Sequence, residues 1–162
     1  MTDILLLKVE ELVTKIKDSQ LTSVEICKRY IERVNEFEKD VKAWAHLNKK
    51  LLLEKAAEAD EYRRSGKPTG PLHGIPVAVK DIIGTLDMPT ECGTKIRKGK
   101  SYSQNAEIID LLLSAGAIVM GKTATSELAY LGPSKTTNPH DYTRTPGGSS
   151  SGSAASVASF MS

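Results

Sequence analysis

The sequence has few aromatic residues, few cysteines and little net charge. Aromatic side chains make up 5% of its 162 residues, and 22 Lys and Arg against 20 Asp and Glu leave a net charge of +2. Because the two signs are interspersed, no basic stripe indicates a nucleic-acid partner. Cys27 and Cys92 are too few for a disulfide scaffold, so we expect two free thiols in a cytoplasmic protein.

Long apolar runs and a leader pattern are also missing. Met1-Thr2-Asp3 carries no positive segment, and the apolar run from Ile4 to Leu7 is far too short for a signal peptide or a membrane span. We therefore expect no membrane contact, and nothing in the sequence indicates a metal or a cofactor. The remaining composition, with 40% hydrophobic residues, is typical of a globular protein with a packed core.

Residues 1–66 have the pattern of a helical segment. Apolar residues recur at helical spacing over 9–16, a capping box at 22–25 begins a second helix, and 49–64 form a third. A short strand is expected at 43–47. The Gly- and Pro-rich stretch that follows the third helix predicts a boundary between residues 66 and 67.

Residues 67–162 have a different pattern, in which apolar strands alternate with a helix. The ranges 75–79 and 117–121 indicate buried strands, and 106–115 indicates the helix between them. This β-α-β unit predicts an α/β fold with a parallel or mixed sheet covered by helices. A last helix is expected over 154–161, still running at Ser162, so we expect the chain to be part of a longer protein.

A glycine- and serine-rich turn leads into that last helix. Its glycines allow the backbone to turn sharply, Ser151 or Ser153 can cap the helix, and the free N–H groups there favour an anion. Two other interpretations remain open. Such a composition also suits a flexible linker. The spacing from Gly147 to Gly152 matches a phosphate loop, although the Lys and Ser or Thr that should follow are missing.

Lys80 is the first candidate for chemistry, because it follows the apolar strand 75–79. Desolvation there would favour the neutral amine, which is the form that accepts a proton. Strand alternation points the neighbouring Asp81 to the opposite face. Lys122 also stands at a strand end. The alternative for Lys80 is a lysine whose stem packs on the sheet while its ammonium reaches solvent.

Four stretches of the chain, in the same order, resemble the amidase signature family. They are Pro71 to Asp81, Gly116 to Thr123, Asn138-Pro139 and Pro146 to Ser153. The resemblance implies the first part of the amidase signature fold and a Ser-cisSer-Lys triad. Lys80 would be the base, and Ser149, directly after Gly148, the bridging serine whose preceding peptide bond is cis. It also implies that Ala129 and Tyr130 line an acyl cleft, and the alternative is a structural tyrosine that packs on the sheet.

In that family the nucleophilic serine and the oxyanion hole belong to a second glycine-rich turn, which would lie beyond Ser162. We therefore expect residues 1–162 to be inactive alone, and the full-length protein to hydrolyse a small carboxamide, as a monomer or a homodimer. One alternative is the glutaminase A subunit of a tRNA-dependent amidotransferase, although Ser126 to Gly132 departs from its usual segment. Another is a phosphate- or nucleotide-binding module. His73 and His140, in loops, are expected to be structural.

Overall fold

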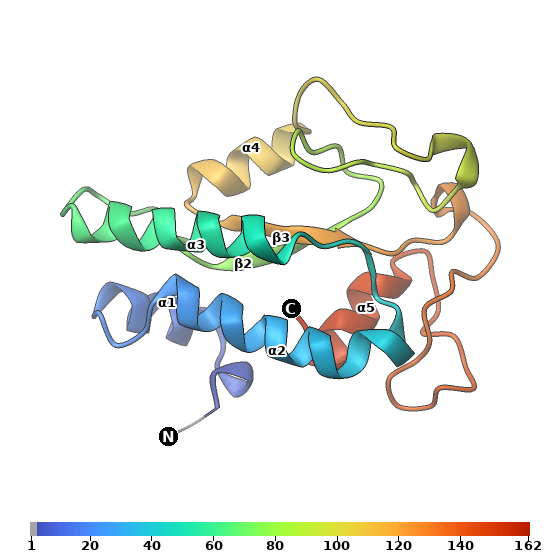
Figure 1. The fold of residues 1–162 in the computed structure, drawn as a ribbon, viewed down its shortest axis with the longest axis horizontal. Helices are drawn as coiled ribbons and strands as arrows, with labels where there is room; N and C mark the ends of the chain where they lie inside the picture. The colour runs from blue at the N-terminus through green and yellow to red at the C-terminus, as the bar shows by residue number, and fades with distance from the viewer. Residues whose placement is uncertain (1–2) are drawn as a thin grey trace.

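A three-stranded mixed sheet forms the centre of the computed structural model, which describes residues 3–162 (Figure 1). Its strands are β1 (Trp44–His46), β2 (Pro76–Lys80) and β3 (Ile118–Thr123), in the spatial order β1-β3-β2. β2 runs parallel to β3, and β1 runs antiparallel to it. The predicted α/β class and mixed sheet are confirmed, with each strand displaced by no more than two residues from the expected range.

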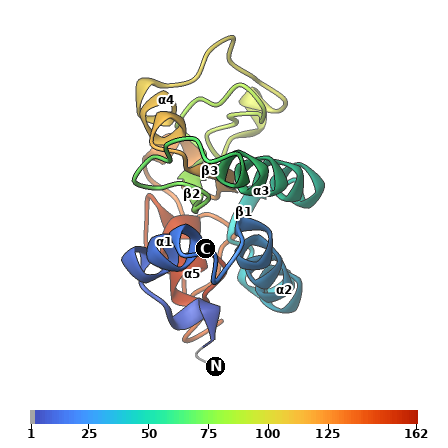
Figure 2. The ribbon, with the colours of Figure 1, turned by 90° about the vertical axis from the view of Figure 1, so that its left-hand side faces the viewer.

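Helices cover both faces of this sheet (Figure 2). On one face lies α4 (Glu107–Ser114), and on the other lie α1 (Val9–Lys17), α2 (Ser23–Val41) and α5 (Ser151–Ala158). α3 (Lys49–Arg64) packs along α2 and also contacts β3. Short 3-10 turns occupy Ile4–Leu6, Lys95–Arg97 and Glu127–Ala129. No helix within residues 3–162 has both the length and the apolar character needed to cross a membrane.

The core reflects the alternation of side chains along β3. Ile118 and Met120 pack in one buried cluster with residues of α2, α3 and α5, whereas Val119 packs with Val79 and Ile109 on the other side. Because the first cluster joins helices from residues 1–66 to the sheet, both parts of the chain contribute to one core. The boundary between residues 66 and 67 stays a prediction.

The start of α2 is fixed by two carboxylates. The predicted capping box is present, since the Thr22 side chain accepts from the Glu25 backbone N–H and the Glu25 carboxylate accepts from the Thr22 N–H at 2.8 Å. Asp60 of α3, only 3% exposed, accepts from the backbone N–H groups of Ser23 at 2.8 Å and Val24 at 3.1 Å. Asp60 therefore ties α3 to the positive end of α2.

Removing the Asp60 carboxylate should destabilise the protein. Asp60→Ala leaves two backbone donors at the α2 N-terminus without a protein acceptor, which we expect to lower the free energy of unfolding by about 2–3 kcal/mol. Urea titration followed by circular dichroism measures this change. Glu58→Ala, at an exposed position on the same helix, is the control. Equal midpoints for the two variants would contradict the capping role.

The last helix differs from its prediction. α5 spans Ser151–Ala158 and does not run on to Ser162. Phe160 adopts a left-handed conformation with φ of 56°, and its N–H bonds the Val157 carbonyl at 3.0 Å while the Met161 N–H bonds the Ser156 carbonyl at 2.8 Å. This is a Schellman-type end without glycine. The turn places Met161, which is fully buried, in the main core cluster.

Both cysteines are free thiols, as predicted. Cys27 lies on the buried side of α2, where burial raises the pKa of its thiol to about 12 and the Asp60 carboxylate adds to that effect. Cys92 is half-buried in the loop after β2.

Candidate active site

The end of β2 and the glycine-serine turn meet at a single short hydrogen bond. Lys80 is the last residue of β2, and its Nζ donates to Ser149 Oγ at 2.6 Å across a sequence separation of 69 residues. Both residues are half-buried. The Gly148–Ser149 peptide bond is cis, as the resemblance implied. The two residues that the sequence singled out for chemistry are therefore in contact.

The turn that carries Ser149 is held by the segment that follows β3. The Ser149 carbonyl accepts from the Ser126 N–H at 3.1 Å and from the Thr125 hydroxyl at 3.0 Å, and the Gly152 N–H donates to the Ala124 carbonyl at 2.9 Å. A flexible linker would not make these fixed contacts. A phosphate loop would need the Gly152 N–H for its ligand, but that donor is already used, so both alternative interpretations lose support.

Hydroxyl pairs, which the sequence analysis missed, fix the first turn of α5. Thr123 Oγ1 and Ser153 Oγ lie 2.7 Å apart, and Ser134 Oγ and Ser151 Oγ lie 2.6 Å apart. The expectation that Ser151 or Ser153 caps the helix is wrong, because the N-cap is Ser150 and its side chain makes no capping bond. The serines of this turn instead contact β3 and the loop at Ser134.

Lys122 and Lys80 have opposite environments, although both stand near the ends of parallel strands. Lys122 is fully buried, and its Nζ lies 3.4 Å from Asp81 Oδ1 and donates to Thr90 Oγ1 at 2.6 Å. Burial lowers the pKa of the Lys122 ammonium, while the Asp81 carboxylate opposes that change. Within residues 3–162, no carboxylate lies in ion-pair range of Lys80, so Lys80 is the lysine available to Ser149.

The other sequence-predicted residues lie apart from this contact or act structurally. His73 is buried, and its Nε2 lies 2.9 Å from the Ala59 carbonyl oxygen, whereas His140 is exposed. Ala129 has a positive φ of 57°, and the adjoining Tyr130 is 77% exposed. A cleft of about 750 Å³ opens at the same end of the strands, with Asp81 among its lining residues. A role for Ala129 and Tyr130 in an acyl cleft stays a prediction.

The contact between Lys80 and Ser149 is suited to proton transfer. A neutral lysine amine accepts a proton from a hydroxyl at this distance, and the hydroxyl can in turn accept one from a second donor on its other side. Because Ser149 is half-buried and not enclosed, a further group can reach its oxygen. The arrangement therefore resembles the inner two members of a catalytic relay.

Relatives among curated proteins match nearly the whole chain. Among them, the A subunit of glutamyl-tRNA(Gln) amidotransferase from Chloroflexus aggregans is 40% identical over 98% of this chain and 34% of its own length. The protein of the same name from Natranaerobius thermophilus is 41% identical over 89% of this chain and 30% of its own length. The chain thus spans about a third of the length of the curated relatives it matches.

Solved structures share the fold at similar coverage. The native peptide amidase from Stenotrophomonas maltophilia has a TM-score of 0.90 and 34% identity, over 97% of this chain and 35% of that one. Fatty acid amide hydrolase has a TM-score of 0.91 and 28% identity, over 98% and 29%. The family model described as Amidase matches residues 25–162, the region that contains all four sequence motifs. On this match, the chain belongs to the amidase signature family.

Proposed function

We propose that this chain forms part of an enzyme that hydrolyses an amide C–N bond, with Lys80 and Ser149 relaying protons for a nucleophilic serine outside residues 1–162. The observation that carries the proposal is the 2.6 Å hydrogen bond between Lys80 Nζ and Ser149 Oγ. The family match and the amidases among the structural neighbours support the same reaction class. The substrate class is a small-molecule amide, and the two free thiols suit the cytoplasm.

The reaction follows from the order of the three groups. Neutral Lys80 takes the Ser149 proton as Ser149 takes the proton of the nucleophilic serine, whose oxygen attacks the amide carbon. The proton then returns along the same path to the leaving nitrogen, the C–N bond breaks, and an acyl-enzyme remains. Water attacks the acyl-enzyme through the same relay and releases the acid. Lys80 therefore acts first as a base and then as an acid.

Ser149→Ala in the full-length protein tests the relay. We expect kcat/KM for a simple amide to fall by about 10²–10⁴-fold, because the proton path from the nucleophile to Lys80 is broken. Ser150→Ala is the matched control, since Ser150 is exposed and its side chain makes no capping bond. Residues 1–162 alone should show no turnover. Full activity of Ser149→Ala, or turnover by residues 1–162 alone, would refute the proposal.

A glutaminase component of an amidotransferase is the second candidate, because curated relatives at 40% identity carry the name of such an enzyme. Assays of the full-length protein with glutamine and with simple amides separate the two functions. Hydrolysis of simple amides by the protein on its own supports the stand-alone amidase. Glutamine hydrolysis that requires further subunits, with no turnover of simple amides, supports the amidotransferase.

A further inference from the structure

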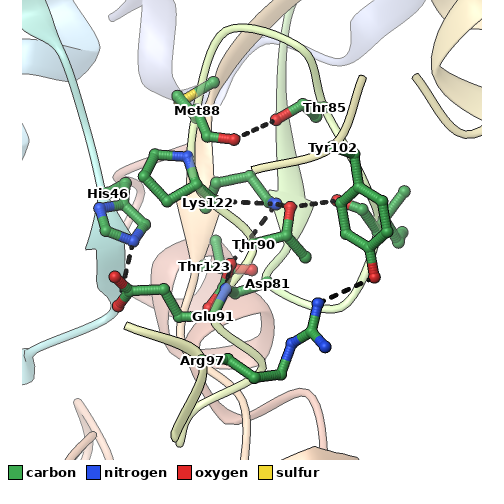
Figure 3. A network of polar contacts seen from close by, with 12 residues as sticks. His46, Asp81, Thr85, Met88, Thr90, Glu91, Arg97, Tyr102, Lys122 and Thr123 are labelled. Atoms are coloured by element: carbon green, nitrogen blue, oxygen red, sulfur yellow. Dashed lines mark hydrogen bonds and ion pairs between the residues drawn. The ribbon is translucent and has the colours of Figure 1, made fainter. Parts of the chain in front are cut away.

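A buried ion pair joins Lys122 and Asp81, and Figure 3 shows both residues among their polar neighbours. Lys122 and Asp81 have exposed fractions of 0% and 1%, and 3.4 Å separates Lys122 Nζ from Asp81 Oδ1. Burying two charges is costly, and a buried pair is frequently no more stable than apolar residues of the same size. A gain in stability therefore does not by itself explain why the pair is present. Neither residue takes part in the proton relay.

The pair and the relay share the same two strand ends. Lys80 is opposite Thr123 in the parallel register, and the Asp81 N–H donates to the Thr123 carbonyl at 3.0 Å. Asp81 directly follows Lys80 in the chain, and Lys122 directly precedes Thr123. Because successive side chains alternate, the Lys122–Asp81 pair occupies the face opposite to Ser149. Asp81 is thus the carboxylate next in sequence to the amine of Lys80.

An uncompensated carboxylate at Asp81 would hold the proton on Lys80. Two unit charges on neighbouring residues, in surroundings of effective dielectric constant about 20, interact strongly enough to move a titration by about 1 pH unit or more. The effect would favour the Lys80 ammonium, which cannot accept a proton from Ser149. The Lys122 ammonium, 3.4 Å from the Asp81 carboxylate, carries the opposite charge and acts against that field.

The other carboxylates around the pair have contacts of their own. Glu91, whose backbone N–H donates to Asp81 Oδ1 at 3.3 Å, has its carboxylate 3.4 Å from His46 Nε2 (Figure 3). Asp87 lies 3.6 Å from Lys55. The Cys92 thiol is the remaining titratable group near Lys122. Within residues 3–162, Lys122 is therefore the ion-pair partner that Asp81 depends on.

We propose that Lys122 is a positioning residue that acts through charge, opposing the field of Asp81 so that Lys80 can serve as the base for Ser149. The inference rests on the proposed function for the role of Lys80 as base. Under this inference the buried pair affects the reaction as well as the packing of the core.

The pH dependence of kcat/KM in the full-length protein tests this role. Lys122→Met leaves the Asp81 charge unpaired. The acidic limb of the plot of kcat/KM against pH should therefore move to higher pH by about 1 unit. The double variant Asp81→Asn with Lys122→Met removes both charges, and its limb should return to the wild-type position. Asp81→Asn alone should leave the limb at or below that position. A purely structural role would lower the rate of every variant without moving the limb.

Nuclear magnetic resonance of ¹³Cε-labelled lysine separates this inference from the proposed function. The Lys80 resonance should titrate about 1 pH unit higher in Lys122→Met and return in the double variant. That shift without any change in the pH profile would support charge cancellation and refute Lys80 as the base. An unmoved Lys80 titration would overturn the inference, whatever the rates. Should Lys122→Met fail to fold, the comparison of Asp81→Asn with the double variant remains, because a neutral replacement of both partners is tolerated best.

Discussion

Lys80→Met in the full-length protein is expected to lower kcat/KM for a simple amide by about 10³-fold or more. Methionine preserves most of the side-chain length but has no amine, so Ser149 loses the acceptor that lies 2.6 Å from its oxygen. Proton transfer to a general base contributes about 10²–10⁴-fold to the rate of a catalysed reaction. The effects of removing members of one relay are not additive, because each member depends on the next. Initial rates across pH 6–10 measure the loss.

The control for this experiment is Lys98→Met, at an exposed position in the loop between β2 and α4. Its activity should match the wild type, which shows that the loss at Lys80 does not come from the removal of a positive charge in general. Thermal unfolding of both variants should stay close to the wild type, since Lys80 is only half-buried. Activity of Lys80→Met within tenfold of the wild type would exclude Lys80 as the base.

Gly152→Ala is expected to lower the free energy of unfolding by about 3 kcal/mol, the upper end for overpacking of a core. A Cβ on Gly152 would overlap the carbonyl oxygen of Ala43 and the backbone nitrogen of Ala124, and would lie 2.9 Å from the Ala124 Cα. These backbone atoms lie just before β1 and just after β3, and they cannot rotate away as a side chain would. Urea titration of the variant measures the change.

The same substitution should also disturb the site. To accommodate the Cβ, the first turn of α5 must move away from the segment after β3, and the Gly152 N–H bond to the Ala124 carbonyl lengthens. Ser149, three residues earlier, then moves relative to Lys80. Ala154→Ser, at an exposed position on α5, is the control and should retain wild-type stability. If Gly152→Ala had the same free energy of unfolding as the wild type, the close approach of α5 to the sheet would be contradicted.

Local signals in the sequence were sufficient for most of the fold. The capping box at Thr22, the apolar periodicity of α2 and the end of α3 before the Gly- and Pro-rich stretch are encoded within one or two turns of chain, and the structure confirms these three features. The strand at 44–46 could be recognised too, but its antiparallel pairing with β3 depends on contacts between distant residues. Sequence pattern therefore predicted the elements and left their pairing undetermined.

The parts of the site that the sequence analysis missed depend on such distant contacts. Lys122 and Lys80 have the same local pattern, since each lysine follows apolar residues. Only the register of β2 against β3 shows that Lys122 pairs with Asp81 and that Lys80 contacts Ser149. The sequence analysis missed the end of α5 because Phe160 takes a left-handed conformation that glycine usually adopts. The turn at Phe160 allows the next residue, Met161, to be buried in the core. The motif resemblance, in contrast, singled out Lys80 and Ser149, which the structure places in contact, and their catalytic roles stay a prediction.

The distance between Lys80 Nζ and Ser149 Oγ in a crystal structure of the full-length protein, grown near pH 8, tests the central claim most directly. The proton relay predicts a separation close to 2.6 Å, with the oxygen of a second serine within hydrogen-bond reach of Ser149 Oγ. A separation beyond about 4 Å, with the Lys80 amine directed to solvent or to a carboxylate, would contradict it.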